Sequence, residues 1–324
     1  MSPWFETYLL LPSPEVAGEL VGCRVESADG IWIAKDATGF PQLLIQPASD
    51  TPNLPRFMLR HLEIDPACRC TVRLPSSPPE QFTATRIRCL ATEPELTDFF
   101  FRTTATIIDS MPKPYTSEAI CAGLDRVAEL FRQLSGKPTR TLQGLWAELF
   151  LLSRATDMPK AASAWQTSPH ALTDFSDRDE SVEVKSTTGD SRRHHFKLAQ
   201  LVPPAGHRWV VASLLLHEDP QGTSLQSLWE RIEDGLAATP HLRIHVASRI
   251  ATALGESWRF SESYRVNEAL AAADLRVFNV AEIPRLDSQP FPAISNVEFV
   301  VDLSGVNAAH ADGRLIANLL ASFA

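Results

Sequence analysis

The chain has 324 residues, of which 44% are hydrophobic and 21% charged, and its formal net charge is −9. This composition is typical of a globular protein that is long enough for two or three domains. The net charge argues against a protein that coats nucleic acid. Its apolar runs are shorter than the ~18 residues that a membrane-spanning helix needs.

Residues 1–115 are expected to form a β-rich domain that ends in a helix. Short runs of β-branched and apolar residues at 31–39, 41–50, 57–64 and 82–90 are separated by Gly, Pro, Asp and Ser, which predicts an antiparallel sheet or small barrel. The run 93–111 then has a helical pattern. A break at 113–117 (KPYTS) marks the expected end of this domain.

Residues 116–216 are expected to form an α/β core. Two helices come first, and the second, over 141–155, carries an apolar stripe at three- and four-residue spacing: Leu142, Leu145, Trp146, Leu149 and Leu152. Five strands are expected to follow, at 163–167, 171–175, 181–186, 194–198 and 207–217. The last is continuously apolar, which is typical of a central strand covered on both faces.

Residues 217–324 are expected to form a mixed α+β region. It begins with helices over 224–238 and 241–255, continues with strands near 275–280 and 296–304, and ends with a helix over 313–323. Charge is distributed unevenly among the three parts. Residues 118–215 hold 12 basic and 11 acidic residues, whereas acidic residues are in excess on both sides.

The cysteines and the first residues predict a cytoplasmic protein. The opening MSPWFETYLLLPSPE carries Glu6 and has no basic cluster, so it does not resemble a secretory signal. An odd number of scattered cysteines indicates a reducing compartment rather than a disulfide framework. They are Cys23, Cys68, Cys70, Cys89 and Cys121.

The stretch 174–186 (DFSDRDESVEVKS) concentrates the residues that could carry chemistry. Side chains alternate across a strand, so Glu183 and Lys185 share one face while Val182 and Val184 share the other. If this strand pairs with 171–175 as a hairpin, Asp174 lies beside Glu183. Two adjacent carboxylates repel each other unless a cation lies between them, and Mg²⁺ prefers such oxygen ligands.

Lys185 completes the arrangement. A lysine two residues after a metal-binding acid, on the same face, can orient an attacking water or offset the charge that develops on a phosphate. A divalent cation, a water and a lysine together predict a phosphodiester hydrolase.

The motif Asp174…Glu183-Val-Lys185 resembles the signature of the PD-(D/E)XK nucleases. Members of that superfamily often carry a glutamate on a preceding helix, as Glu148 does in GLWAELF, and a glutamine after the ExK strand, as Gln200 does in FKLAQL. The surrounding sequence is similar to an uncharacterised group of prokaryotic PD-(D/E)XK proteins. Those proteins are frequently encoded beside restriction-modification or phage-defence genes.

The resemblance implies a restriction-endonuclease-like core over residues 116–216, with a mixed central sheet flanked by helices. It implies a Mg²⁺- or Mn²⁺-dependent DNA endonuclease in which Asp174, Glu183 and Glu148 hold the metal. Lys185 would act on the nucleophile or on the developing charge, and Gln200 would belong to the same catalytic set. The proline that precedes the first acid in many members is replaced here by Thr173.

Basic residues directly after the ExK strand are candidates for contacts with DNA phosphates, which supply affinity without sequence specificity. These residues are Arg192, Arg193 and Lys197. The resemblance also implies partners from a defence system, such as a methyltransferase or an ATPase. A homodimer would suit cleavage of both strands.

Simpler interpretations stand beside this one. Glu183 and Lys185 could form an ordinary cross-strand ion pair, Asp174 could initiate a turn, and Glu148 could be a surface acid on its helix. The alternative function is a PD-(D/E)XK scaffold that binds DNA or a partner protein without cutting. RNA is an alternative substrate.

Overall fold

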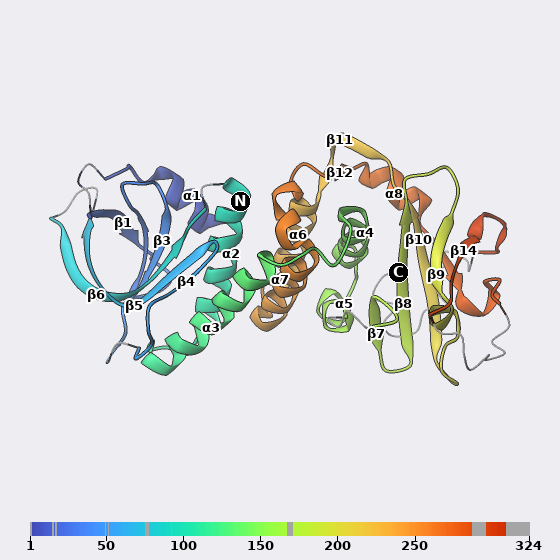
Figure 1. Cartoon of the computed structure of the whole chain (residues 1–324), viewed down its shortest axis with the longest axis horizontal. Helices are drawn as coiled ribbons and strands as arrows, with labels where there is room; N and C mark the ends of the chain where they lie inside the picture. Colours follow the sequence, from blue (N-terminus) through green and yellow to red (C-terminus); the bar gives the residue numbers. More distant parts are fainter. Residues whose placement is uncertain are drawn as a thin grey trace. The chain divides into compact units, whose positions relative to one another are not determined.

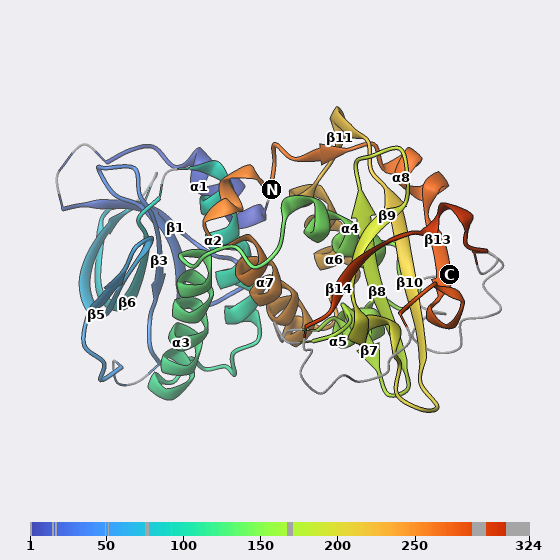
Figure 2. The same cartoon turned by 45° about the vertical axis from the view of Figure 1, so that its right-hand side comes forward.

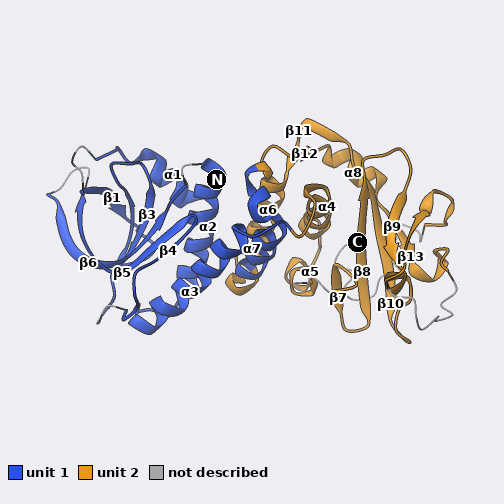
Figure 3. Cartoon of the chain, in the orientation of Figure 1, with its two compact units in different colours: residues 1–138, 243–259 blue, residues 139–242, 260–324 orange. Residues whose placement is uncertain are grey.

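A computed structural model describes residues 2–14, 16, 18–48, 50, 52–74, 78–91, 93–166, 171–286 and 296–308. The chain forms two compact units, shown in Figure 3. Unit 1 comprises residues 1–138 and 243–259, and unit 2 comprises residues 139–242 and 260–324. The structure contains both helices and strands, as expected. The helix expected over 313–323 lies outside the described residues.

The two units differ from the three regions expected from the sequence, whose limits were 115 and 216. Helix α3 (Ser117–Leu134) belongs to unit 1, where its apolar face packs against helix α2 (Pro94–Asp109). The chain returns to unit 1 within helix α7 (Pro240–Leu254), where Ser248 donates a hydrogen bond to Gln133 at 3.0 Å. Helical periodicity identifies a buried face but not the element that buries it.

The sheet of unit 1 closes on itself. Its strand order is β1-β2-β3-β6-β5-β4, and β1 also pairs in parallel with β5 (Figure 1). The strands are β1 (Leu20–Arg24), β2 (Ile31–Lys35), β3 (Pro41–Ile45), β4 (Phe57–Leu59), β5 (Leu62–Arg73) and β6 (Glu80–Cys89). At Gly22 of β1, a Cβ atom would lie 2.7 Å from the carbonyl oxygen of Ile33, so the close approach of the neighbouring strand requires glycine.

Apolar side chains fill the inside of this sheet, as alternation along the strands predicts. One core cluster consists of Leu20, Trp32, Ala34, Leu44, Cys70, Val72 and Ala84. Helix α1 (Pro3–Leu10), which the sequence analysis did not predict, packs against α2 and β2. Its N-cap is Ser2, whose hydroxyl accepts a hydrogen bond from the amide of Phe5.

Unit 2 contains the second sheet and the helices that surround it. Its remaining helices are α4 (Leu142–Ser153), α5 (Met158–Ala164), α6 (Leu225–Gly235) and α8 (Glu268–Asp274). Its strands are β7 (Phe175–Asp177), β8 (Glu180–Thr187), β9 (Arg193–Lys197), β10 (Arg208–Leu215), β11 (Glu218–Ser224), β12 (Arg265–Val266), β13 (Arg276–Asn279) and β14 (Glu298–Asp302). The short 3₁₀ turn η1 (Leu198–Leu201) follows β9, whereas η2 (Gly255–Phe260), which follows α7, belongs to unit 1 up to residue 259.

The main sheet of unit 2 has the order β13-β10-β8-β7 and is mixed. Strands β8 and β10 are parallel, whereas β7 and β13 pair antiparallel at the two edges. Strand β10 therefore has a neighbour on each side, as its continuous apolar sequence predicted.

Different elements cover the two faces of this sheet, as Figures 1 and 2 show. Helix α4 packs against β8 and α6 on one side. On the other side the paired strands β9 and β14 close over an apolar cluster that includes Phe196, Trp209 and Val211. Helix α4 is buried on all its faces from Leu145 onwards, including Ala147 and Phe150 outside the expected stripe, because it lies between β8 and α6.

Two strand predictions in unit 2 were wrong in detail. Residues 163–164 end helix α5, which begins at the N-cap Asp157 with a proline in its first turn. Among the described residues 163–166, only Trp165 makes a bridge, to Phe175. Strand β7 begins at Phe175 rather than at residue 171. Among the described residues, no helix is both long enough and apolar enough to cross a bilayer.

Candidate active site

The hairpin of β7 and β8 places Asp174 beside Glu183. The ladder pairs Phe175 with Val182, and Asp174 lies one position further along. The Asp174 amide donates to the carbonyl of Val182 at 3.1 Å, and its Oδ2 accepts from the amide of Val184 at 2.8 Å. These two bonds fix the Asp174 carboxylate against β8, so the expected hairpin is present.

Glu183 and Lys185 lie on the face of β8 that is turned towards β9. They stand opposite Val211 and Ser213 of β10, and the Lys185 Nζ lies 5.1 Å from the ring centroid of Phe196. The Lys185 Nζ is 2.7 Å from the Glu183 Oε1. Glu183 and Lys185 share one face of β8, as expected, and Glu183 is only 5% exposed because β9 and η1 cover this face.

Gln200, in η1, is the residue that holds this cover in place. Its Nε2 donates to the Glu183 Oε1 at 2.6 Å and to the carbonyl of Leu172 at 3.1 Å. Its Oε1 accepts from the Lys185 Nζ at 3.3 Å and from the amide of Lys197 at 3.0 Å. One amide therefore links the strand β8 to the segments before β7 and after β9.

Glu148 reaches the same region from helix α4. It is 4% exposed, and its two carboxylate oxygens have different partners. The Oε1 accepts from the Arg140 Nε at 3.1 Å, and the Oε2 accepts from the Trp165 Nε1 at 2.8 Å. Burial of a carboxylate costs free energy unless it has such hydrogen-bond partners. Glu148 is therefore not the surface acid that the simpler interpretation expected.

Arg140 was not identified from the sequence. It stands directly before Thr141, the N-cap of α4, and its guanidinium also donates from Nη2 to the Asp174 Oδ1 at 3.3 Å. Trp165, which is 2% exposed, was not identified as a site residue either. A buried indole N–H normally needs an acceptor, and this requirement was the available signal for Trp165.

The electrostatics of the cluster favour an additional positive charge. Burial, and then the neighbouring charge of Asp174, raise the pKa of Glu183 to about 8, although Lys185 acts in the opposite direction. The charge of Glu148 raises it further. Three carboxylates (Glu148, Asp174 and Glu183) thus face two cationic side chains (Arg140 and Lys185).

The donor set is chemically suited to Mg²⁺ or Mn²⁺. Both ions prefer carboxylate oxygens, and Mg²⁺ retains several waters, so two or three acids suffice. As they are placed, no three His, Cys, Asp or Glu side chains of the described residues are arranged as ligands of one ion. In this cluster Arg140 contacts both Glu148 and Asp174, so the same oxygens serve a guanidinium.

Arg192 does not lie where a DNA contact requires it. It is 8% exposed, and its guanidinium donates to the backbone and hydroxyl of Ser213 and to the carbonyl of Asp274. Alternation along β9 explains this, because residues 192, 194 and 196 point inwards together. Its assignment to phosphate binding was therefore wrong.

Arg193 and Lys197 are exposed on the opposite face of β9. In the β9–β14 ladder they stand across from Asp302 and Glu298. These two basic residues are thus accessible, but each has an acidic cross-strand neighbour that weakens its attraction for a phosphate.

A family model matches most of the chain. This model, described as "Putative PD-(D/E)XK family member (DUF4420)", matches residues 5–304. No curated protein and no solved structure matches the chain. Because the family model covers both units and contains the whole cluster, the chain belongs to this PD-(D/E)XK family.

Proposed function

We propose that this protein is a metal-dependent endonuclease that hydrolyses DNA phosphodiester bonds. The observation that carries the proposal is the convergence of Glu148, Asp174 and Glu183 with the Lys185 ammonium in one buried cluster of unit 2. A cluster of buried carboxylates, one of which (Glu183) has a raised pKa, next to a lysine is typical of a functional site. Membership of the PD-(D/E)XK family supports the same reaction class.

The carboxylates of Asp174, Glu183 and Glu148 would hold Mg²⁺ or Mn²⁺. When bound, a divalent cation supplies Lewis-acid stabilisation for the negative charge that develops on the phosphate. The Gln200 side-chain amide hydrogen-bonds to both Glu183 and Lys185 and so fixes their relative position. Trp165 fixes one oxygen of Glu148 by its indole N–H.

Lys185 would supply the remaining positive charge. Its Nζ lies at the edge of the cluster and its side chain is 18% exposed, so a phosphate can approach it. There it would orient the attacking water and offset charge on the transition state. Arg193 and Lys197, which are exposed on β9, would contribute phosphate contacts of lower specificity.

Plasmid cleavage tests this proposal. Supercoiled DNA is incubated with the purified chain and Mg²⁺ or Mn²⁺, with EDTA as the metal-free control. We expect nicked or linear product, and we expect Lys185→Ala to lower the rate at least about 100-fold, as removal of one charge-stabilising group does. Lys160→Ala is the matched control, because Lys160 lies outside the cluster, on α5 near Asp177.

A non-cleaving scaffold is the second candidate. It is favoured by the fact that each acid of the cluster already contacts a basic side chain of the chain itself. In that case wild type and Lys185→Ala would shift DNA equally in a gel, and neither would cut it. An arm with RNA in place of DNA separates the two nucleic acids as substrates.

The biological setting that we propose is restriction or phage defence, and the sequence resemblance is its support. A methyltransferase or an ATPase would then be a partner, and a homodimer would allow both strands to be cut. Co-purification with the products of neighbouring genes and sedimentation of the pure chain test these two points separately.

A further inference from the structure

We infer that Arg140 is an internal counter-ion of the acidic cluster, and that a divalent cation binds there only by displacing its guanidinium. This inference rests on the proposed function, because it concerns the same cluster. It assigns to Arg140 a regulatory role that opposes metal binding in the resting protein.

The contacts of Arg140 support this role. Its Nε donates to Glu148 at 3.1 Å and its Nη2 donates to Asp174 at 3.3 Å, so one guanidinium joins acids from two different elements. The planar fork of arginine suits such a two-ended contact, which a single ammonium cannot reproduce. Glu183, the third acid, is bonded instead to Lys185 and Gln200.

The charges support it as well. Arg140 forms ion pairs with Glu148 and Asp174, and the Glu183 carboxylate also acts on its charge. The guanidinium thus lies in the field of all three acids. A divalent ion held by the Glu148 Oε1 and Asp174 Oδ1 would lie next to the guanidinium that contacts both oxygens, and the two cations would repel each other.

Arg140 is also placed so that it can leave. Its side chain is 34% exposed, whereas those of Glu148 and Asp174 are almost covered. It lies outside α4, whose N-cap is Thr141, and the Thr141 Oγ1 accepts from the amide of Gly144 at 3.0 Å. Release of the guanidinium therefore leaves the helix cap intact.

Metal affinity in the absence of DNA tests the inference. Mn²⁺ is titrated into metal-free protein by calorimetry, with wild type, Arg140→Ala and the matched control Arg154→Ala. Arg154→Ala removes the same charge from the other end of α4, where the Arg154 guanidinium lies over the ring of Phe150. We expect Arg140→Ala to bind Mn²⁺ at least about fivefold more tightly than wild type, and Arg154→Ala to bind it as wild type does.

Competition by free guanidinium sharpens the test. In Arg140→Ala, guanidinium chloride at low, non-denaturing concentration should weaken Mn²⁺ binding more than sodium chloride at equal ionic strength does. Wild type should show no such difference, because its own guanidinium already fills the position. Arg140→Lys is the second variant, which keeps a charge if Arg140→Ala does not fold. It should also bind Mn²⁺ more tightly than wild type, because one ammonium cannot make both contacts.

The outcomes distinguish this inference from the proposed function. Equal or weaker Mn²⁺ binding in both Arg140 variants, with binding abolished by Asp174→Asn, would overturn the role of Arg140 and leave the metal site standing. Absence of Mn²⁺ binding in wild type and in every variant would contradict the metal site itself, and the inference with it.

Discussion

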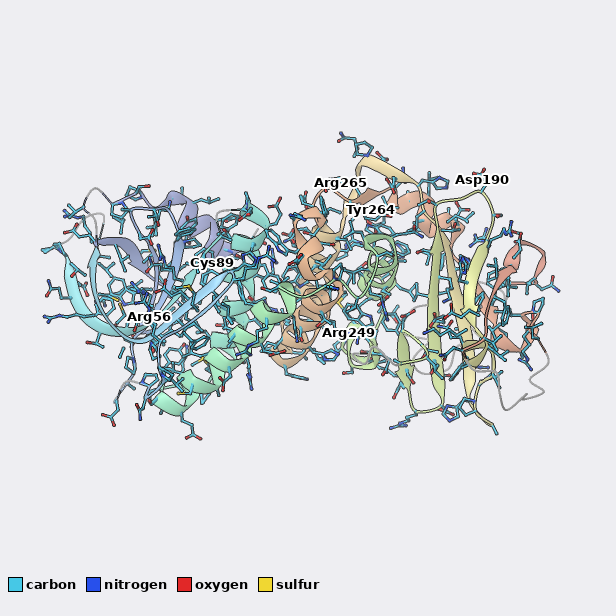
Figure 4. The ribbon with its side chains drawn as sticks, viewed as in Figure 1. Arg56, Cys89, Asp190, Arg249, Tyr264 and Arg265 are labelled. Carbon is cyan, nitrogen blue, oxygen red and sulfur yellow. The ribbon has the colours of Figure 1, made fainter. Side chains whose placement is uncertain are left out.

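Each unit of the molecule contains a buried acid surrounded by basic side chains, and the two clusters differ in charge balance. In unit 1 Glu63 of β5 is 2% exposed and accepts hydrogen bonds from Arg56, Arg86 and Arg88. Figure 4 shows Arg56 beside the strands of this unit. In unit 2 Glu183 is equally buried, but two further acids share its cluster.

The Glu63 cluster is neutral. Its three arginines face three acids, since Arg88 also lies 2.7 Å from Asp36 and Arg86 lies 3.6 Å from Asp65. Burial alone would raise the pKa of Glu63, but the hydrogen bonds from Arg88 and Arg56 outweigh it and the pKa is lowered. The Glu63 carboxylate is therefore stabilised in its charged form by the chain itself.

The Glu183 cluster has one acid more than it has basic side chains, because three acids face Arg140 and Lys185. The pKa of Glu183 is raised for this reason as well as by burial. Burial beside arginine is thus common to a structural ion network and to a candidate active site. The excess of acids over basic side chains distinguishes the candidate active site from the structural network.

The largest expected difference between the two clusters is in stability, when each buried acid is replaced by its neutral amide. Glu63→Gln replaces the carboxylate that three arginines share by a neutral amide, so we expect a loss of about 2 kcal/mol in the free energy of unfolding, discounted for the partial exposure of the arginines. Urea denaturation at pH 7.5 in EDTA measures it. Cleavage of DNA per folded molecule should stay unchanged in this variant.

Glu183→Gln is the counterpart in unit 2. Because the folded protein already favours the protonated side chain at this pH, the neutral amide should change the free energy of unfolding by less than about 1 kcal/mol. Equal destabilisation by both substitutions would show that the two clusters are alike and would remove the distinction.

The pH dependence of stability should have opposite signs in the two clusters. The raised pKa of Glu183 gives a stabilising contribution that is complete below its ordinary value of 4.5 and is lost as the pH rises through about 8. The lowered pKa of Glu63 gives one that is present above 4.5 and is lost as the pH falls through its folded value. Each slope is at most about 1.4 kcal/mol per pH unit.

Metal-free denaturation from pH 4 to pH 9 measures these slopes as differences between wild type and each glutamine variant. Wild type should lose stability relative to Glu183→Gln between pH 5 and pH 8. It should gain stability relative to Glu63→Gln as the pH rises from about 4. A flat difference for Glu183→Gln would contradict the raised pKa.

The parts of the site that depend on short-range pattern were predictable from the sequence. Alternation along β8 placed Glu183 and Lys185 on one face, and the adjoining run of residues brought Asp174 to that strand. Family resemblance added Glu148 and Gln200, both of which lie in the cluster. Asp174, Glu183 and Lys185 lie within one hairpin, so the local pattern was sufficient to bring them together.

The parts that depend on packing between distant segments were not predictable. Arg140 contacts Asp174 across 34 positions in the sequence, and the loop before α4 has no period that would indicate this contact. Burial of Glu183 likewise depends on η1, whose place over β8 is fixed by the Gln200 amide. The assignment of Arg192 to phosphate binding was avoidable. Arg192 is four positions before Phe196, so both side chains lie on the same, inward face of an extended segment.

Calorimetric titration of Mn²⁺ into metal-free wild type, Glu183→Gln and Glu63→Gln is the most direct test of the claim that the unit 2 acids form a divalent-cation site. We predict binding to wild type and to Glu63→Gln with equal affinity, and a loss of at least about tenfold in Glu183→Gln, because removal of one ligand charge costs more than 1.4 kcal/mol. Undiminished binding in Glu183→Gln, or no binding in wild type, would contradict the account.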